Sequence, residues 1–218
     1  MSGRPPSVPR APGASRYGWF VGVVIVLVLA YITLNTARHT NSQSSTGPKP
    51  GARLPPFATP LALSRLDGDA NIATEKTKRS NAGKVPACRV RRRDVLNSCA
   101  LSERGPVVLA FLATRGGRCI AELDVLERLR RAYPQVQFAA VAIRGDRDDL
   151  RRTIRGHGWR FPVGYDRDGV LANLYGVAVC PQITLAGRNG RVRKTLIGSS
   201  STDAAHMRRE LDALARTR

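Results

Sequence analysis

The sequence predicts an α/β domain with a mixed central sheet flanked by helices, preceded by a single transmembrane helix. Two observations indicate the domain. Apolar strand-like runs alternate with helical periodicity from residue 107 onward, and the last two of these runs flank an Asn-Gly turn. A third observation, an uncharged stretch near the amino terminus, predicts the membrane-spanning helix.

The uncharged stretch reads YGWFVGVVIVLVLAYITL and covers residues 17–34. About eighteen apolar residues are the minimum that crosses the hydrocarbon core of a bilayer as a helix. We therefore expect a disordered cytoplasmic tail over residues 1–16, a transmembrane helix over 17–35 and a flexible linker over 36–53. A cleaved signal peptide is the alternative, but no Ala-x-Ala cleavage site follows the stretch.

The flanking charges and the cysteine content predict where the chain resides. Basic residues on the two sides of the apolar stretch slightly favour a cytoplasmic amino terminus. Four cysteines in a small domain suit an oxidising compartment. The expectation is a single-pass protein of the cell membrane, with its C-terminal domain outside the cytoplasm.

The chain is strongly basic, with a formal net charge of +20. Because 31 of its 36 basic residues are arginines dispersed among carboxylates on presumptive helices, we expect a solvated basic face and no nucleic-acid partner. The sequence RVRRR at residues 89–93 is the one dense cluster.

The domain is expected over residues 54–218, with an insertion at about 76–104. Within it VVLAFLA (107–113) and VQFAAVAI predict buried strands, each followed by a helical pattern, CIAELDVLERLRRAYP and DRDDLRRTIRGHG. The second of these helices should be capped near Asp146 and end at Gly156 or Gly158.

The remaining segments complete the domain. RDGVLANLYGV predicts a short helix, QITLAG and RVRKTLIG predict a hairpin around RNG, and TDAAHMRRELDALAR predicts an amphipathic closing helix with a Thr or Asp cap. This order of elements predicts that the first strands are parallel and the last pair antiparallel.

The segment FLATRGGRCIAEL resembles the active-site segment of membrane-tethered, TlpA-like thioredoxins, F-W-A-x-W-C-x-x-C-x-x-E. Phe111, Ala113, Cys119 and Glu122 match this pattern in register, whereas Gly116 stands where the attacking cysteine belongs. FPVGYDRDGVLANLYGVAVCPQITLAGRNGRV and LPPFATPLALSRLDGDA are similar to further parts of redoxin (AhpC/TSA-type) domains. The resemblance spans roughly residues 54–216 and implies a thioredoxin-like fold that acts in thiol-disulfide exchange.

The resemblance also implies an arrangement of the site. Pro181 would be a cis-proline that shapes the substrate groove together with the loop at Gly116. The residue before that proline lies against the active-site loop in the family fold, so Cys180 would approach Cys119. Our hypothesis is that Cys119 and Cys180 form a redox pair that replaces the missing CxxC; the alternative is that both are inert. Glu122 is expected to handle protons, to pack, or to act as a first-turn carboxylate that favours the helix dipole.

Cys88 and Cys99 lie eleven residues apart in CRVRRRDVLNSC, within the insertion. A local disulfide between them would contribute roughly 3 kcal/mol in the chain-entropy model. The alternative is that one of them resolves an oxidised Cys119.

The predicted activity is that of a thiol-disulfide oxidoreductase acting on protein thiols or disulfides. One alternative is a peroxiredoxin-like peroxidase that reduces peroxide through Cys119, although Leu112 and Gly116 replace the proline and threonine of that motif. The other is a non-catalytic binding module, which the Gly116 replacement favours. No cofactor or metal is expected, because the cysteines and histidines lack ligand spacing, and the sequence identifies no partner reductase.

Overall fold

The computed structural model describes residues 16–39, 47–76, 82–114, 117–198 and 203–216. The chain divides into two units, residues 1–42 and 43–218, and each is described by itself. The first unit contains helix α1 (Arg16–His39), which includes the predicted span over 17–35. Within the described part of the chain, no helix meets the length and apolarity needed to cross a bilayer. The expected tail lies outside the described residues except for Arg16.

The second unit contains the sheet domain. Its strands are β1 (Ala58–Pro60), β2 (Val95–Asn97), β3 (Val107–Ala113), β4 (Gln137–Arg144), β5 (Val163–Tyr165), β6 (Gln182–Ala186) and β7 (Val192–Ile197). Its helices are α2 (Ser98–Arg104), α3 (Gly117–Arg130), α4 (Arg147–His157), α5 (Val170–Leu174) and α6 (Ala204–Ala215), with short 3-10 turns η2 (Ala87–Arg89) and η3 (Arg188–Gly190).

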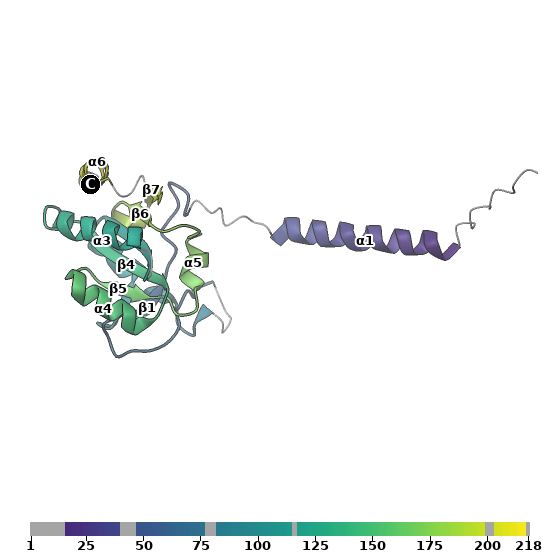
Figure 1. The fold of residues 1–218 in the computed structure, drawn as a ribbon, viewed down its shortest axis with the longest axis horizontal. Helices are drawn as coiled ribbons and strands as arrows, with labels where there is room; N and C mark the ends of the chain where they lie inside the picture. The colour runs from purple at the N-terminus through teal and green to yellow at the C-terminus, as the bar shows by residue number, and fades with distance from the viewer. Residues whose placement is uncertain (1–15, 40–46, 77–81, 115–116, 199–202, 217–218) are drawn as a thin grey trace, which may run out of the picture. The chain divides into compact units, whose positions relative to one another are not determined.

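The main sheet has the strand order β5-β4-β3-β6-β7. Figure 1 labels β4, β5, β6 and β7 of this sheet. Strand β3 is parallel to β4 and antiparallel to β6, and β6 forms an antiparallel pair with β7. The mixed α/β sheet expected from the sequence is therefore confirmed. The hairpin turn between β6 and β7 contains Asn189 at φ 74° and Gly190 at φ 69°. Asn and Gly tolerate this left-handed conformation best, which is why the dipeptide marks the turn.

Two apolar layers cover opposite faces of the sheet because side chains alternate along β3. The even-numbered residues of β3 face a layer that includes Leu123 of α3, Leu150 of α4 and Leu211 of α6. The odd-numbered residues face a second layer that includes Leu101 of α2 and Leu171 of α5. Strand β3 is therefore buried on both sides.

The ends of α4 follow the predicted capping signals. Asp146 accepts hydrogen bonds from the amides of Asp148 and Asp149 at 2.9 and 3.0 Å, which satisfies amides that have no partner within the helix. Gly158 closes the helix at φ 65°, and of the two predicted ends it is the one that adopts the left-handed conformation.

Helix α3 is attached to the segment that follows α4. Asp124 accepts a 2.8 Å hydrogen bond from the indole of Trp159 and lies 3.0 Å from Nδ1 of His157. One turn further, Glu127 accepts a 2.9 Å hydrogen bond from the amide of Arg160. These contacts fix the long axis of α3, and with it the residues at its amino-terminal end.

Several elements differ from the expectations. Strand β5 extends the sheet beyond the predicted strands, and the insertion at 76–104 contains β2 and α2, with β2 paired to β1. Elements this short carry too few residues to show a hydrophobic period.

Residues 47–53, within the expected linker, lie along β7. The amide of Gly51 donates to Val192 O at 2.7 Å, and the amide of Val192 donates to Ala52 O at 2.8 Å. Residues 40–46 lie outside the described part.

Truncating the layer that supports α3 should destabilise the domain. Leu123 is 0% exposed within this layer, so Leu123→Ala should lower the free energy of unfolding by about 2–5 kcal/mol. Leu63→Ala is the matched control, because Leu63 is 52% exposed and should change the free energy by about 0.5 kcal/mol or less. Urea unfolding monitored by circular dichroism measures both; equal losses would contradict the assignment of Leu123 to the core.

Candidate functional site

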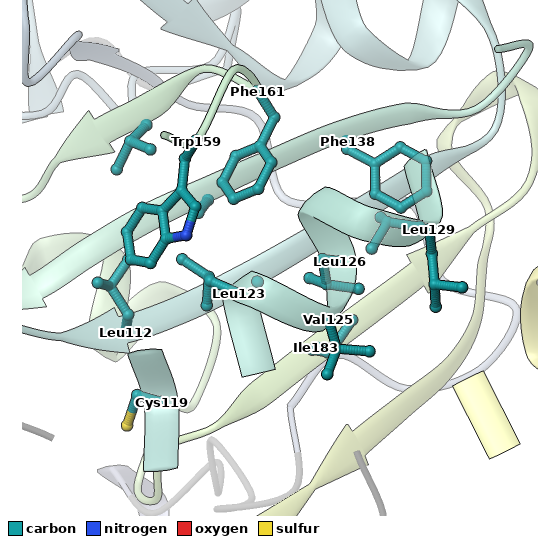
Figure 2. Close-up of a cluster of buried hydrophobic side chains, with 14 of the residues drawn as sticks. Leu112, Cys119, Leu123, Val125, Leu126, Leu129, Phe138, Trp159, Phe161 and Ile183 are labelled. Atoms are coloured by element: carbon teal, nitrogen blue, oxygen red, sulfur yellow. The ribbon is translucent and has the colours of Figure 1, made fainter. Parts of the chain in front are cut away.

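Cys119 occupies the first turn of α3, as its third residue. Figure 2 shows it at the edge of the apolar layer, with its sulfur directed away from Leu123. The side chain is 3% exposed. A thiolate at this position is stabilised by the unpaired amides and the positive end of the helix dipole. Gly116, the other residue assigned to the active-site loop, lies outside the described residues.

Cys180 lies just before β6, whereas Cys119 lies at the start of α3. Its Sγ lies 3.4 Å from the carbonyl oxygen of Phe111 on β3, and its side chain is partly exposed. The Cys180–Pro181 peptide bond is cis. The carbonyl of Pro181 accepts a 2.9 Å hydrogen bond from the amide of Gly198, so the start of β6 is held by the end of β7.

A disulfide joins Cys119 to Cys180 across 61 residues of sequence. Their Cα atoms are 5.7 Å apart, within the usual range for such bonds. The sheet explains the approach. Phe111 pairs with Gln182 in the antiparallel ladder, so the end of β3 and the start of β6 are neighbours. The two sulfurs differ in access, because Cys119 is enclosed and Cys180 faces solvent in part.

Glu122 lies one helical turn after Cys119 and is 0% exposed. Residues three apart on a helix are neighbours on one face. Neither carboxylate oxygen of Glu122 has a hydrogen-bond partner among the described residues. Burial without compensation raises its pKa from 4.5 to about 7. The sequence pattern marked this glutamate, but its burial is visible only in the fold.

The second pair of cysteines lies on the other face of the sheet. A disulfide joins Cys88, in η2, to Cys99, in α2, with the Cα atoms 5.4 Å apart. Helix α2 packs through Leu101 on the layer opposite the one that contains Cys119. Because the sheet separates the two disulfides, this arrangement argues against resolution of Cys119 by either cysteine while the domain is folded.

The basic cluster at residues 89–93 is largely neutralised by neighbouring carboxylates. Three of its arginines form ion pairs, Arg89 with Glu75, Arg91 with Glu103 and Arg92 with Asp94. The cluster therefore presents much less net charge than its sequence suggests.

Comparison with known proteins supports the fold. No family model matches the chain. Over 137 residues, covering 62% of this chain and 79% of the relative, the sequence is 26% identical to the thiol-disulfide oxidoreductase ResA of Geobacillus thermodenitrificans. A putative thiol:disulfide interchange protein DsbE from Chlorobium tepidum has a similar structure, with a TM-score of 0.58 and 20% identity over 77% of this chain and 98% of that chain. Peroxidoxin BcpB from Mycobacterium tuberculosis gives a TM-score of 0.56 and 16% identity over 78% and 98%.

The strand order, the position of α3 after β3 and these structural likenesses agree on one architecture. The second unit has a thioredoxin-like fold.

Replacing Glu122 should change how stability depends on pH. The folded protein holds the proton of Glu122 up to about pH 7, whereas the unfolded chain releases it near 4.5, so wild-type stability falls as pH rises through this window. The glutamine in Glu122→Gln cannot ionise, so this variant should not lose stability in that window. The free energy of unfolding of the variant minus that of wild type should therefore increase by about 3 kcal/mol between pH 4 and pH 8.

Urea unfolding at both pH values measures this difference. Glu75→Gln is the matched control, because it removes a carboxylate whose side chain is 74% exposed. An equal pH response in the two variants would exclude a proton held by Glu122.

Proposed function

We propose that this protein is a thiol-disulfide oxidoreductase that uses Cys119 and Cys180 as its redox pair. The observation that carries the proposal is the disulfide between an enclosed cysteine at a helix start and a partly exposed cysteine before a proline. The likeness to a relative named as a thiol-disulfide oxidoreductase supports it. Cys180 would supply the second sulfur that the active-site loop lacks, because Gly116 stands where the attacking cysteine of the family pattern belongs.

Because Cys180 is more exposed than Cys119, we assign Cys180 as the cysteine that a substrate thiolate attacks first. A substrate thiolate attacks Sγ of Cys180, the more exposed residue of the pair, and a mixed disulfide forms while Cys119 leaves as a thiolate. A second substrate thiolate then attacks the mixed disulfide and releases Cys180 as a thiolate. Two substrate thiols become one disulfide, and the cysteine pair gains two electrons and, after protonation, two protons. Reduction of a substrate disulfide runs the same steps in reverse.

The amino-terminal end of α3 makes Cys119 the better leaving group. Its thiolate is stabilised there by helix amides, and a thiol with a lower pKa leaves faster in exchange. In reverse, a buried thiol must lose its proton before it attacks. Glu122, one turn along the same helix with a pKa of about 7, is suited to exchange that proton near neutral pH.

Single replacements should separate the roles of the two cysteines. Cys119→Ser and Cys180→Ser should each reduce catalysed insulin reduction by dithiothreitol to the uncatalysed rate, because neither variant can complete the exchange. Cys119→Ser should also trap a mixed disulfide through Cys180, whereas Cys180→Ser should trap little, because Cys119 is 3% exposed.

Ala132→Ser, on the exposed turn after α3, is the matched control and should retain wild-type rates. Equal activity of wild type and both cysteine variants would leave the non-catalytic binding module as the function. Trapping through Cys119 rather than Cys180 would reverse the assigned order of attack.

The peroxiredoxin-like alternative requires peroxide to reach Cys119. The likeness to a peroxidoxin at 16% identity shows the fold alone, and the enclosed thiol gives this alternative less support. A peroxide-consumption assay with mass analysis of reduced protein tests it: sulfenic acid on Cys119 together with turnover would establish the peroxidase.

We also propose that residues 17–35 anchor the chain in the cell membrane, with the amino terminus in the cytoplasm and the second unit outside. The uncharged sequence of this stretch supports the proposal, as do the exposed apolar side chains along α1, including Trp19, Leu27 and Ile32. The full chain should stay with membranes after an alkaline carbonate wash, and deletion of residues 17–35 should release it. Release of the intact full chain by the wash would contradict the anchor.

A further inference from the structure

A cavity adjoins the disulfide between Cys88 and Cys99. Its volume is about 620 Å³, within the range of about 300–1,000 Å³ that is typical of small-molecule sites. Both cysteines line it, together with Arg53 and Arg191, which pair in an isolated antiparallel bridge beside η3. None of its lining residues belongs to the site around Cys119.

The two cysteines of this disulfide line the cavity. Both Cys88 and Cys99 are partly exposed, in contrast to Cys119. A disulfide that serves only to stabilise a core is usually enclosed by it, whereas exchange requires a path for the attacking thiolate. This bond lies in the wall of an open cavity and meets that requirement.

The uncompensated charge of the cavity is positive. Glu103 is the one carboxylate among the described lining residues, and Arg91 binds both of its oxygens at 2.7 and 2.8 Å. Arg191 donates a 3.0 Å hydrogen bond to the carbonyl of Gly51, and no described carboxylate pairs with Arg191 or Arg53. Two guanidinium groups in the lining of the same cavity therefore remain to receive an anion.

We propose that the Cys88–Cys99 disulfide is a second thiol-exchange site, whose cavity takes a small thiol that carries a carboxylate. The thiolate attacks one sulfur of the disulfide, a mixed disulfide forms and the other cysteine leaves as a thiolate. A second molecule of the small thiol attacks the mixed disulfide and releases the remaining cysteine. Two small thiols become one small disulfide, and Cys88 and Cys99 each gain an electron and then a proton.

This site is independent of the proposed Cys119–Cys180 pair. The two disulfides lie on opposite faces of the sheet, so electrons need not pass between them. The proposal consequently stands or fails separately from the proposed function.

The test uses the full chain with Cys119→Ser and Cys180→Ser, so that one disulfide remains. The reductants are 3-mercaptopropionate, which carries a carboxylate, and 2-mercaptoethanol, which is neutral. Each rate is divided by the rate of that thiol with a small neutral disulfide, which removes the difference in intrinsic reactivity. Alkylation followed by mass analysis reports reduction of Cys88 and Cys99 while circular dichroism confirms the folded state.

We expect 3-mercaptopropionate to be favoured by about three- to tenfold at low salt, as charge pairs with two exposed arginines allow. The preference should disappear in high salt and in the Arg53→Gln, Arg191→Gln variant, and persist in the Arg53→Lys, Arg191→Lys variant, which keeps the charges. Equal normalised rates for the two thiols, or reduction only after denaturation, would overturn the proposal. The salt series on the parent chain decides the question if a charge variant fails to fold.

Discussion

The position of β3 is the constraint on which the rest of the structure depends. The strand is hydrogen-bonded to β4 on one side and to β6 on the other, and its side chains are buried in two separate apolar layers. A strand enclosed in this way must be apolar along its length, and its backbone must pair on both edges. Its carboxyl end delivers the chain to α3 and Cys119, while the antiparallel β6 brings Cys180 to the same end of the sheet. The disulfide between these cysteines follows from strand pairing and not from sequence proximity.

The same strand divides the domain into two chemical environments. One face holds Cys119 and Glu122 in an enclosed apolar layer, where the low polarity makes the charge on each group sensitive to its neighbours. The other face holds the Cys88–Cys99 disulfide beside an open cavity with two arginines that pair with no carboxylate in the described part of the chain. In the two proposed exchange sites, a buried thiol and a partly exposed disulfide would call for different reductants, because enclosure limits attack to a partner that reaches Cys180, whereas an open cavity admits small molecules.

Glu122 is the clearest departure from a purely structural core. A buried carboxyl group that has no hydrogen-bond partner among the described residues costs stability, and such groups concentrate at functional sites where a shifted pKa is useful. In the proposed exchange, its place one turn after Cys119 would account for this cost in stability, since a group that titrates near neutrality suits proton exchange with a neighbouring thiol. The strong attachment of α3 through Asp124 and Glu127 keeps the two side chains on one rigid element.

The amino-acid sequence alone predicts those structural features that depend on a few neighbouring residues. The apolar run of β3, the caps of α4 and the Asn-Gly turn all appear in the structure where the residues predicted them, because these signals act over a few neighbouring residues. The pairing of Cys119 with Cys180 followed from a family resemblance, since spacing alone cannot connect cysteines 61 residues apart. Four features could be identified only from the folded structure: the short strand β5, the elements within the insertion, the burial of Glu122 and the cavity beside Cys99. These features depend on contacts between distant segments, and no local pattern records which distant residue will fill, cover or leave open the space around a side chain.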